Sequence, residues 1–248
     1  MAPLLSRDDP QAKALAAAIR GGDLQALRQL LDGNPQLANA RIQGRGEGQR
    51  TPLHIAADWP GYFPNAPRAV EILIGAGADP SPPSIVGRPS ETPLHWAASS
   101  DDVDVAAALI AGGADIEAPG ASIAGGSPLD DAVGYGCWRV AQLLLQHGAK
   151  VERLWLAAAL GLLARMDELF AAEPPTTDDV NHAFYQACSG GQRRAAEYLY
   201  AHGADPNWIP DYAKATPLEA ATSPGTGRKA LATWLHELAA KQDSPSAT

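Results

Sequence analysis

The sequence predicts an all-α solenoid, a stack of helix-turn-helix units, from a recurring motif and its constant spacing. A Thr-Pro-Leu-His segment at Thr51–His54 returns at Thr92–His95, and weaker copies follow at Ser127–Asp130 and Thr216–Glu219. A unit repeated at this spacing cannot bury its apolar face alone, so its copies must stack and share a core. We therefore predict about seven units, which begin near Lys13, Thr51, Thr92, Ser127, Glu152, His182 and Thr216.

The helix ends of these units can be located from residues that tolerate a left-handed backbone. Gly113, Gly148 and Gly203 each lie 21 positions after the start of the third, fourth or sixth unit. Glycine adopts the left-handed conformation that ends many helices without a steric penalty, and asparagine tolerates it. The same offset makes Asn34 the end of the first unit. Asp9–Pro10 is predicted to supply the N-cap and first position of the opening helix.

Each helix pair is expected to be followed by a projecting hairpin, with one exception. Only Ala149–Val151 separate the end of the fourth unit from the fifth, so the hairpin between these units is predicted to be missing. Glu173–Pro175 ends the fifth unit, where proline makes a rigid break. We predict a single domain over residues 1–242 and a disordered tail over 243–248, which is rich in serine and proline.

Small residues mark the places where neighbouring first helices approach closely. Alanine pairs at Ala56–Ala57 and Ala97–Ala98 leave no room for larger side chains. Cys188 occupies the second of these slots in the sixth unit, which predicts a buried packing residue and not a reactive thiol. The other cysteine, Cys137, belongs to a different unit, and neither shows metal-ligand spacing. We therefore expect reduced thiols, with no disulfide and no metal site.

The composition narrows the classes of partner and location. The chain has 28 acidic and 19 basic side chains and a net charge of -9, which disfavours nucleic acid because phosphate binding depends on lysine and arginine. Arg41, Arg45 and Arg50 lie among glycines, but no helix starts there, which favours a flexible hairpin tip over a phosphate site. No segment predicts a membrane span or a signal peptide. A cytoplasmic monomer is expected.

The repeated motif resembles that of ankyrin repeats. The resemblance rests on the Thr-Pro-Leu-His segments, the alanine pairs that follow them, and the Gly-Ala-Asp unit ends at Gly77–Asp79, Gly113–Asp115 and Gly203–Asp205. It extends over about Gln11 to Leu238 and is weakest in the fifth unit. It implies a curved stack with a concave groove, formed by first helices and hairpins, that generally binds partner proteins. The insert of the second unit also resembles that of a group of bacterial ankyrin proteins.

The second unit departs from the pattern through an aromatic insert. Gly77 lies 26 positions after Thr51 instead of 21, so extra residues fall within Asp58–Pro67. The prolines of this segment forbid a continuous helix. Its three large rings, Trp59, Tyr62 and Phe63, have two interpretations. They form either a miniature core that folds the loop onto the next repeat, or one wall of a binding site.

Polar and aromatic residues at matching places in the next units extend this candidate site. In ankyrin-like stacking, the two residues after the small pair face the groove. Here they are Asp58–Trp59, Ser99–Ser100 and Gly134–Tyr135. Asp101 replaces a usual glycine, and Asp101 and Asp102 either line the groove or start the next helix. The candidate binding residues are Asp58, Trp59, Tyr62, Phe63, Trp96, Ser99, Ser100, Asp101, Asp102, Asp131 and Tyr135.

Two functions from different classes remain open. The first is a protein-interaction module whose groove in units two to four holds a protein partner. The alternative is an enzyme acting on a small polar molecule or a carbohydrate, in which Asp58, Asp101, Asp130 and Asp131 supply paired carboxylates. No nucleophile, phosphate or zinc motif appears, so catalytic residues are not assigned and no cofactor or metal is expected. The resemblance implies a structural hydrogen bond between units for His54 and His95.

Overall fold

The computed structural model describes residues 2–44, 48–85, 89–222 and 228–242, and these ranges fold as an all-α solenoid with one small sheet. The chain divides into two compact units, Met1–Lys150 and Val151–Thr248, each of which is described by itself. The prediction of a single domain over 1–242 stays a prediction. The predicted tail, 243–248, lies outside the described residues.

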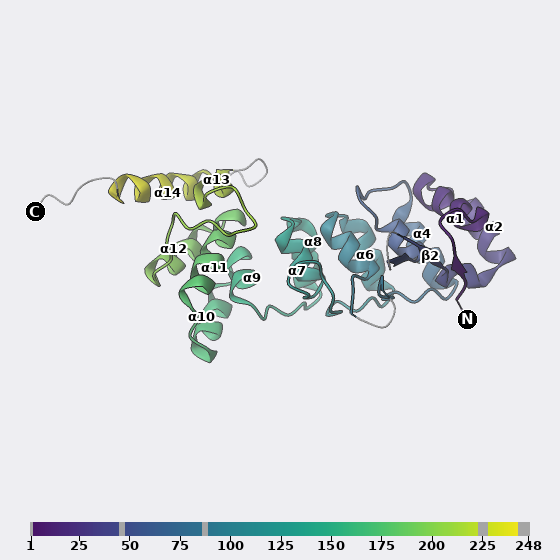
Figure 1. Cartoon of the computed structure of the whole chain (residues 1–248), viewed down its shortest axis with the longest axis horizontal. Coiled ribbons are helices and arrows are strands. Elements are labelled where there is room, and N and C mark those ends of the chain that lie inside the picture. The colour runs from purple at the N-terminus through teal and green to yellow at the C-terminus, as the bar shows by residue number, and fades with distance from the viewer. Residues whose placement is uncertain (1, 45–47, 86–88, 223–227, 243–248) are drawn as a thin grey trace, which may run out of the picture. The chain divides into compact units, whose positions relative to one another are not determined.

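In its described residues, the first unit has four antiparallel helix pairs, which follow one another in chain order (Figure 1). The first helix of each pair packs on the first helix of the next, and the second helices pack in the same way. This arrangement puts equivalent side chains of successive pairs side by side. The helices are α1 (Pro10–Gly21), α2 (Leu24–Gly33), α3 (Pro52–Ala56), α4 (Ala66–Gly75), α5 (Pro93–Ser99), α6 (Val103–Ala111), α7 (Pro128–Gly134) and α8 (Trp138–Gln146).

The recurring four-residue motif is a helix start that satisfies its own backbone. Thr51 is the N-cap of α3, Pro52 occupies the first turn, and the Nδ1 atom of His54 accepts a hydrogen bond from the Thr51 N–H at 3.2 Å. Asp130 does the same for the N–H of Ser127 at 2.8 Å. A helix start needs an acceptor at this position, which explains why the histidine of the motif can become a carboxylate.

The predicted helix ends are confirmed, including Asn34 as the C-cap of α2, but Asn34 lacks the left-handed conformation that the glycines have. Gly113, Gly148 and Gly203 have φ angles of 90°, 86° and 93°. Asn34 instead has a φ of -153°, which is extended backbone, because a 3-10 helix, η1 (Pro35–Asn39), continues the chain directly after α2. Asp9 caps α1 as predicted, since its carboxylate accepts from the N–H of Gln11 at 2.7 Å.

The sheet joins the amino-terminal segment to the first hairpin. Its strands, β1 (Leu4–Leu5), β2 (Arg41–Gln43) and β3 (Gln49–Arg50), lie in that order, with β1 parallel to β2 and β2 antiparallel to β3. Hairpins were expected after the other units too, but the described residues form no further strands. The connection from Asp115 to Gly126 instead closes as turns, in which the N–H of Ala121 bonds the Gly126 carbonyl at 2.9 Å.

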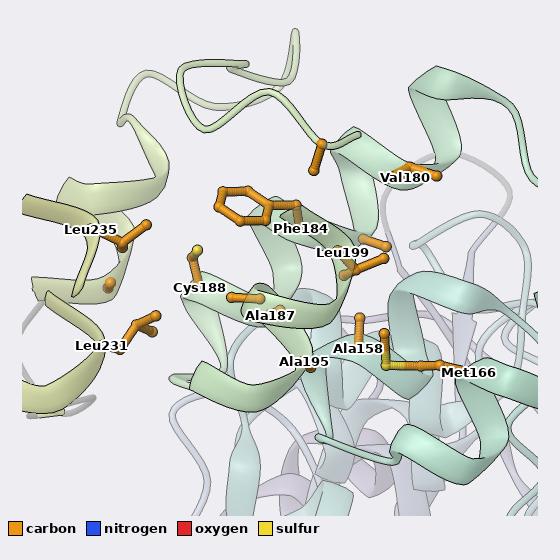
Figure 2. Close-up of a cluster of buried hydrophobic side chains, with 14 of the residues drawn as sticks. Ala158, Met166, Val180, Phe184, Ala187, Cys188, Ala195, Leu199, Leu231 and Leu235 are labelled. Carbon is orange, nitrogen blue, oxygen red and sulfur yellow. The ribbon is translucent and has the colours of Figure 1, made fainter. Parts of the chain in front are cut away.

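The second unit holds the remaining helices around a separate core. They are α9 (Leu154–Ala159), α10 (Leu163–Ala172), α11 (Thr177–Ser189), α12 (Arg193–Ala201), α13 (Pro217–Thr222) and α14 (Lys229–Gln242). Figure 2 shows Phe184 and Cys188 of α11 between Leu231 and Leu235 of α14 on one side and Met166 of α10 on the other. Cys188 is fully buried and reduced, and burial raises the pKa of its thiol.

The alanine pairs lie at the predicted seam between first helices. Ala56, Ala57, Ala97 and Ala98 are all fully buried. Because the first helices stack directly on one another, a larger side chain at these positions would meet the neighbouring backbone. The close approach positions the ends of α3, α5 and α7, from which the candidate site extends.

Candidate functional site

The insert of the second helix pair forms a loop between α3 and α4. α3 ends at Ala56, and α4 starts only at Ala66. The residue before a proline is disfavoured in helical conformation, so Pro60 prevents Trp59 from continuing α3. Tyr62 and Asn65 both have a φ of 55°, which turns the chain sharply within the loop.

This early helix end corrects the predicted equivalence of three groove positions. Ser100 and Tyr135 are the C-cap residues of α5 and α7 with closely similar backbone angles, and Ala57 takes this place in α3. Trp59 therefore lies beyond the helix, in the loop, and does not occupy the place of Ser100 and Tyr135. The difference arises because α5 and α7 have no proline after their small pair.

Polar contacts hold the loop against three neighbouring helix pairs. The N–H of Tyr62 donates to the carboxylate of Asp102 at 2.5 Å, and the Tyr62 hydroxyl bonds the backbone carbonyl of Asp101. The Tyr62 hydroxyl also accepts from the guanidinium of Arg139 at 2.7 Å. On the other side, the Asn65 amide donates to the Gly22 carbonyl at 3.0 Å. Because these hydrogen bonds join the loop to residues far away in the sequence of the same folded unit, they restrict the loop conformation.

The aromatic rings of the insert do not form a miniature core. Trp59 is 78% exposed and Tyr62 is 49% exposed. The half-buried ring of Phe63 lies 5.8 Å from the guanidinium of Arg20. Hydrogen bonds, not ring packing, therefore attach the loop to its neighbours, and its largest apolar side chain is left in contact with water.

Asp58 is held in an ion-paired arrangement at the base of the loop. Its Oδ2 atom lies 2.6 Å from Arg20 and 3.3 Å from Arg50. Arg50 lies on β3, beside the hairpin turn and not at its tip as expected; Arg45 is outside the described residues. Arg20, Arg50 and Arg139 were missed by sequence reasoning, because nothing in their spacing indicates that they meet the insert. Asn65 belongs to the insert but was not among the candidate residues.

Asp101 and Asp102 start helices, one of the two roles considered for them. Asp102 is the N-cap of α6, where its Oδ1 accepts from the Val105 N–H at 3.1 Å while Oδ2 holds the insert. Asp101 has a φ of 52°, as expected for a residue in place of glycine. Its Oδ1 accepts from the N–H groups of Arg139 and Val140 at 3.1 and 3.0 Å, which caps α8 in the next pair.

The serines and Trp96 contact the surrounding backbone and a histidine. The hydroxyls of Ser99 and Ser100 donate to the Trp96 carbonyl at 3.1 and 2.8 Å. The Trp96 ring packs edge-on against His54, with 4.9 Å between ring centroids. These three residues therefore support the end of α5, and Trp96 is only partly exposed to the groove.

His54 and His95 have the structural role that the resemblance implied. The Nε2 atom of His54 lies 3.2 Å from the Glu91 carbonyl, and that of His95 lies 3.5 Å from the Gly126 carbonyl, each in the following connection. Burial lowers the pKa of His54 to about 3 and that of His95 to about 4. Both rings are neutral at pH 7 and link consecutive helix pairs.

Asp131 and Tyr135 form a second group, attached to the loop before α7. The Oδ1 atom of Asp131 accepts from the Ser122 hydroxyl and the Ile123 N–H, both at 3.0 Å, and Ser122 also bonds the Tyr135 hydroxyl at 2.9 Å. Asp131 is fully buried, and burial raises its pKa to about 6. Its Oδ2 atom has no hydrogen-bond partner among the residues that the structure describes.

Cys137 joins the residues around the insert to the second group, which contains Asp131 and Tyr135. The buried thiol of Cys137 donates to the Ser99 carbonyl at 3.4 Å, and burial together with the charge of Asp101 raises its pKa to about 11. The four carboxylates considered for acid-base work serve other contacts: Asp58 pairs with arginines, Asp101 and Asp130 cap helices, and Asp131 holds a loop. Within the described ranges, no group of three or more potential ligands is placed to hold a metal ion.

Comparison with known proteins identifies the class. Residues 61–153 match the family described as ankyrin repeats (3 copies). This match shows ankyrin repeats within residues 61–153 of the chain. The match covers three copies, so the count of seven repeats stays a prediction. Ankyrin repeat domains generally bind protein partners, which supports a protein-interaction module as the class of function.

Two solved structures are similar to this chain over most of its length. One is the human ASB11 ankyrin repeat domain, which is 18% identical with a TM-score of 0.48; the alignment covers 89% of this chain and 96% of that chain. The other is the ankyrin repeat domain of Bcl-3, a unique member of the IkappaB protein family, which is 24% identical with a TM-score of 0.49 and coverages of 85% and 94%. No curated protein matches the sequence.

None of the helices in the described part of the chain combines the length and the apolar character needed to cross a bilayer.

Proposed function

We propose that the chain captures a protein partner through the groove of its second to fourth helix pairs, with the insert between α3 and α4 as the main contact. The observation that supports this most directly is the exposure of Trp59, at 78%, on a loop that hydrogen bonds hold in place. Tryptophan and tyrosine supply large contact area at interfaces and are enriched among the residues that dominate binding energy.

The attachment of the loop strengthens the proposal. Binding costs free energy when flexible side chains and loops become ordered. Here the N–H of Tyr62 is bonded to Asp102, its hydroxyl contacts Asp101 and Arg139, and Asn65 is bonded to Gly22. Because much of this ordering is complete before a partner arrives, the loop presents Trp59 at a lower entropic cost than a free loop would.

The test is selection of binding peptides from a random displayed library, followed by titration of each selected peptide. We expect peptides that bind the wild-type chain to lose affinity about 30-fold with Trp59→Ala, the loss expected for a central aromatic anchor. Trp59 contributes little to the core, so the melting temperature should stay nearly unchanged.

The matched control is Leu4→Ala, which removes another exposed apolar side chain, 58% exposed, from β1 of the same unit. It should leave the affinity unchanged. Equal affinities of wild type and Trp59→Ala for every selected peptide would remove Trp59 from the binding surface and with it this placement of the function.

A further inference from the structure

The second unit carries an aromatic cluster outside the groove proposed above. We name it the His182 cluster, after the side chain at its centre. Its members come from three segments that are far apart in sequence: α9, α11 and the connection between α12 and α13. They are Trp155, His182, Tyr185, Trp208 and Tyr212.

Three rings surround His182. Its ring centroid lies 5.8 Å from that of Trp155, 6.4 Å from that of Trp208 and 5.7 Å from that of Tyr212. The Tyr212 ring also packs edge-on against Tyr185, with 6.3 Å between centroids. These distances are those of interacting aromatic side chains, so the rings form one continuous group.

A buried amide orients the outermost ring. Gln186, which is 7% exposed, donates from its Nε2 atom to the Tyr212 hydroxyl at 3.0 Å. Gln186 lies on α11, one turn after His182, so the helix that carries the central ring also positions the Tyr212 hydroxyl. The position of the Tyr212 ring is therefore determined by the fold, even though most of the side chain is in water.

The cluster lies at the surface, although Tyr185 is buried and Trp155 packs against the core of this unit. Tyr212 is 61% exposed and its neighbour Ile209 is 42% exposed, while Trp155, His182 and Trp208 are partly exposed. The core of this unit is built from other residues of α11, among them Phe184 and Cys188 (Figure 2). Aromatic side chains that are held in place and remain open to water are typical of binding surfaces.

The charges around the cluster favour a cation. The carboxylates of Asp179 and Asp211 lie close enough to His182 for their negative charge to favour its protonated form, which raises its pKa. Burial nevertheless lowers the pKa of His182, and burial raises that of Tyr212 to about 12, so both rings are neutral at pH 7. Neutral ring faces are electron-rich and attract ammonium and guanidinium groups.

We infer that the His182 cluster binds a lysine or arginine side chain presented by a basic segment of a partner protein, with the cation over the rings of Trp208 and Tyr212 and near Asp211. The net charge of -9 of the whole chain favours the approach of such a segment. This surface lies on α9, α11 and the connection before α13 and shares no residue with the groove proposed for the first unit. The test of this inference is therefore independent of the test of that groove.

The probe is a fluorescein-labelled peptide of alternating lysine and glycine, titrated with the full chain and followed by fluorescence anisotropy. A second peptide with Nε-acetylated lysines keeps the methylene chain of each side chain and removes the charge. We expect the lysine peptide to bind and the acetylated one to lose at least about tenfold in affinity. No binding of the lysine peptide, or equal binding of both, would overturn the inference.

Ring variants separate contact with the cluster from attraction by the net charge. Tyr212→Ala and Trp208→Leu keep every charge, and each should weaken binding of the lysine peptide about 2- to 5-fold. Tyr212→Phe keeps the ring, so it should bind like the wild type. Because Tyr212 is mostly exposed, its variants should fold, which thermal unfolding checks. Wild-type affinity in both ring-removing variants would contradict the inference.

A matched pair of charge variants completes the test. Asp211→Asn and Glu237→Gln each remove one exposed carboxylate from the second unit. Of these two carboxylates, only that of Asp211 lies close enough to His182 to raise its pKa. We expect Asp211→Asn to weaken binding of the lysine peptide more than Glu237→Gln does. Equal losses would mean that the peptide responds only to the net charge, and the cluster would no longer be assigned a ligand.

Discussion

The carboxylate of Asp102 performs two tasks at once: Oδ1 caps α6, and Oδ2 accepts the N–H of Tyr62 at 2.5 Å, 40 positions earlier in the sequence. Asp102 is almost fully buried. One side chain therefore couples the start of a helix to the shape of the insert that presents Trp59. This coupling gives the first prediction.

Asp102→Ala should destabilise the chain and loosen the insert. Loss of an N-cap costs about 0.5–2 kcal/mol, and the Tyr62 N–H also loses its acceptor. We expect a lower free energy of unfolding in urea and faster cleavage by chymotrypsin after Tyr62. Asp104→Ala removes an exposed carboxylate two positions later, so it should change neither property much. Wild-type proteolysis of the Asp102 variant would contradict the coupling.

The two motif histidines predict a loss of stability in mild acid. Both are neutral in the folded state, where their pKa values are about 3 and about 4. In the unfolded chain the pKa is about 6.5, so the unfolded state binds more protons as the pH falls from about 6.5 toward about 4. Stability gained from the neutral rings is present above pH 6.5 and is lost across this window.

The measurement is urea unfolding of the wild type and of the double variant His54→Gln/His95→Gln between pH 7.5 and 4.5. The wild type should lose roughly 2 to 5 kcal/mol more than the variant over this range. Comparing the two chains removes the contribution of the carboxylates, which they share. Parallel pH dependences would show that the histidines do not titrate as their burial indicates.

The raised pKa of Asp131 predicts a change of stability with pH that is opposite in sign to that of the two histidines. Its folded pKa of about 6 lies above the usual value of 3.8, so ionisation of this buried carboxyl destabilises the fold as the pH rises from about 4 through about 6. Asp131→Asn keeps an acceptor for Ser122 and Ile123 without the charge. It should raise stability by roughly 1 to 3 kcal/mol at pH 8 and by less at pH 4.5.

The control for Asp131→Asn is Asp32→Asn, which changes the net charge equally at an exposed position of α2. It should shift the melting temperature little at either pH. If Asp131→Asn lowers stability at pH 8, the ionised carboxylate contributes more through its hydrogen bonds than its burial costs, and the prediction is wrong.

Much of the fold could be predicted because it depends on local chemistry. The acceptor at the fourth motif position satisfies the N–H of the first, whether it is His54 or Asp130, and a glycine such as Gly113 ends the helix in a left-handed conformation. Proline in the insert interrupts α3 for an equally local reason. Each of these features involves residues only a few positions apart, so their spacing is visible in the sequence.

The partners of the insert were decided by tertiary structure alone. Asp102, Asp101 and Arg139 reach Tyr62 only because successive helix pairs stack at a fixed distance. The same holds for the rings around His182, which come from segments that no periodicity relates. The sequence by itself determined the repeats, the helix starts and the interruption of the second unit by the insert. Contacts between repeats depend on the stacking geometry, so only the folded chain decided which side chains hold the loop and which remain open to a partner.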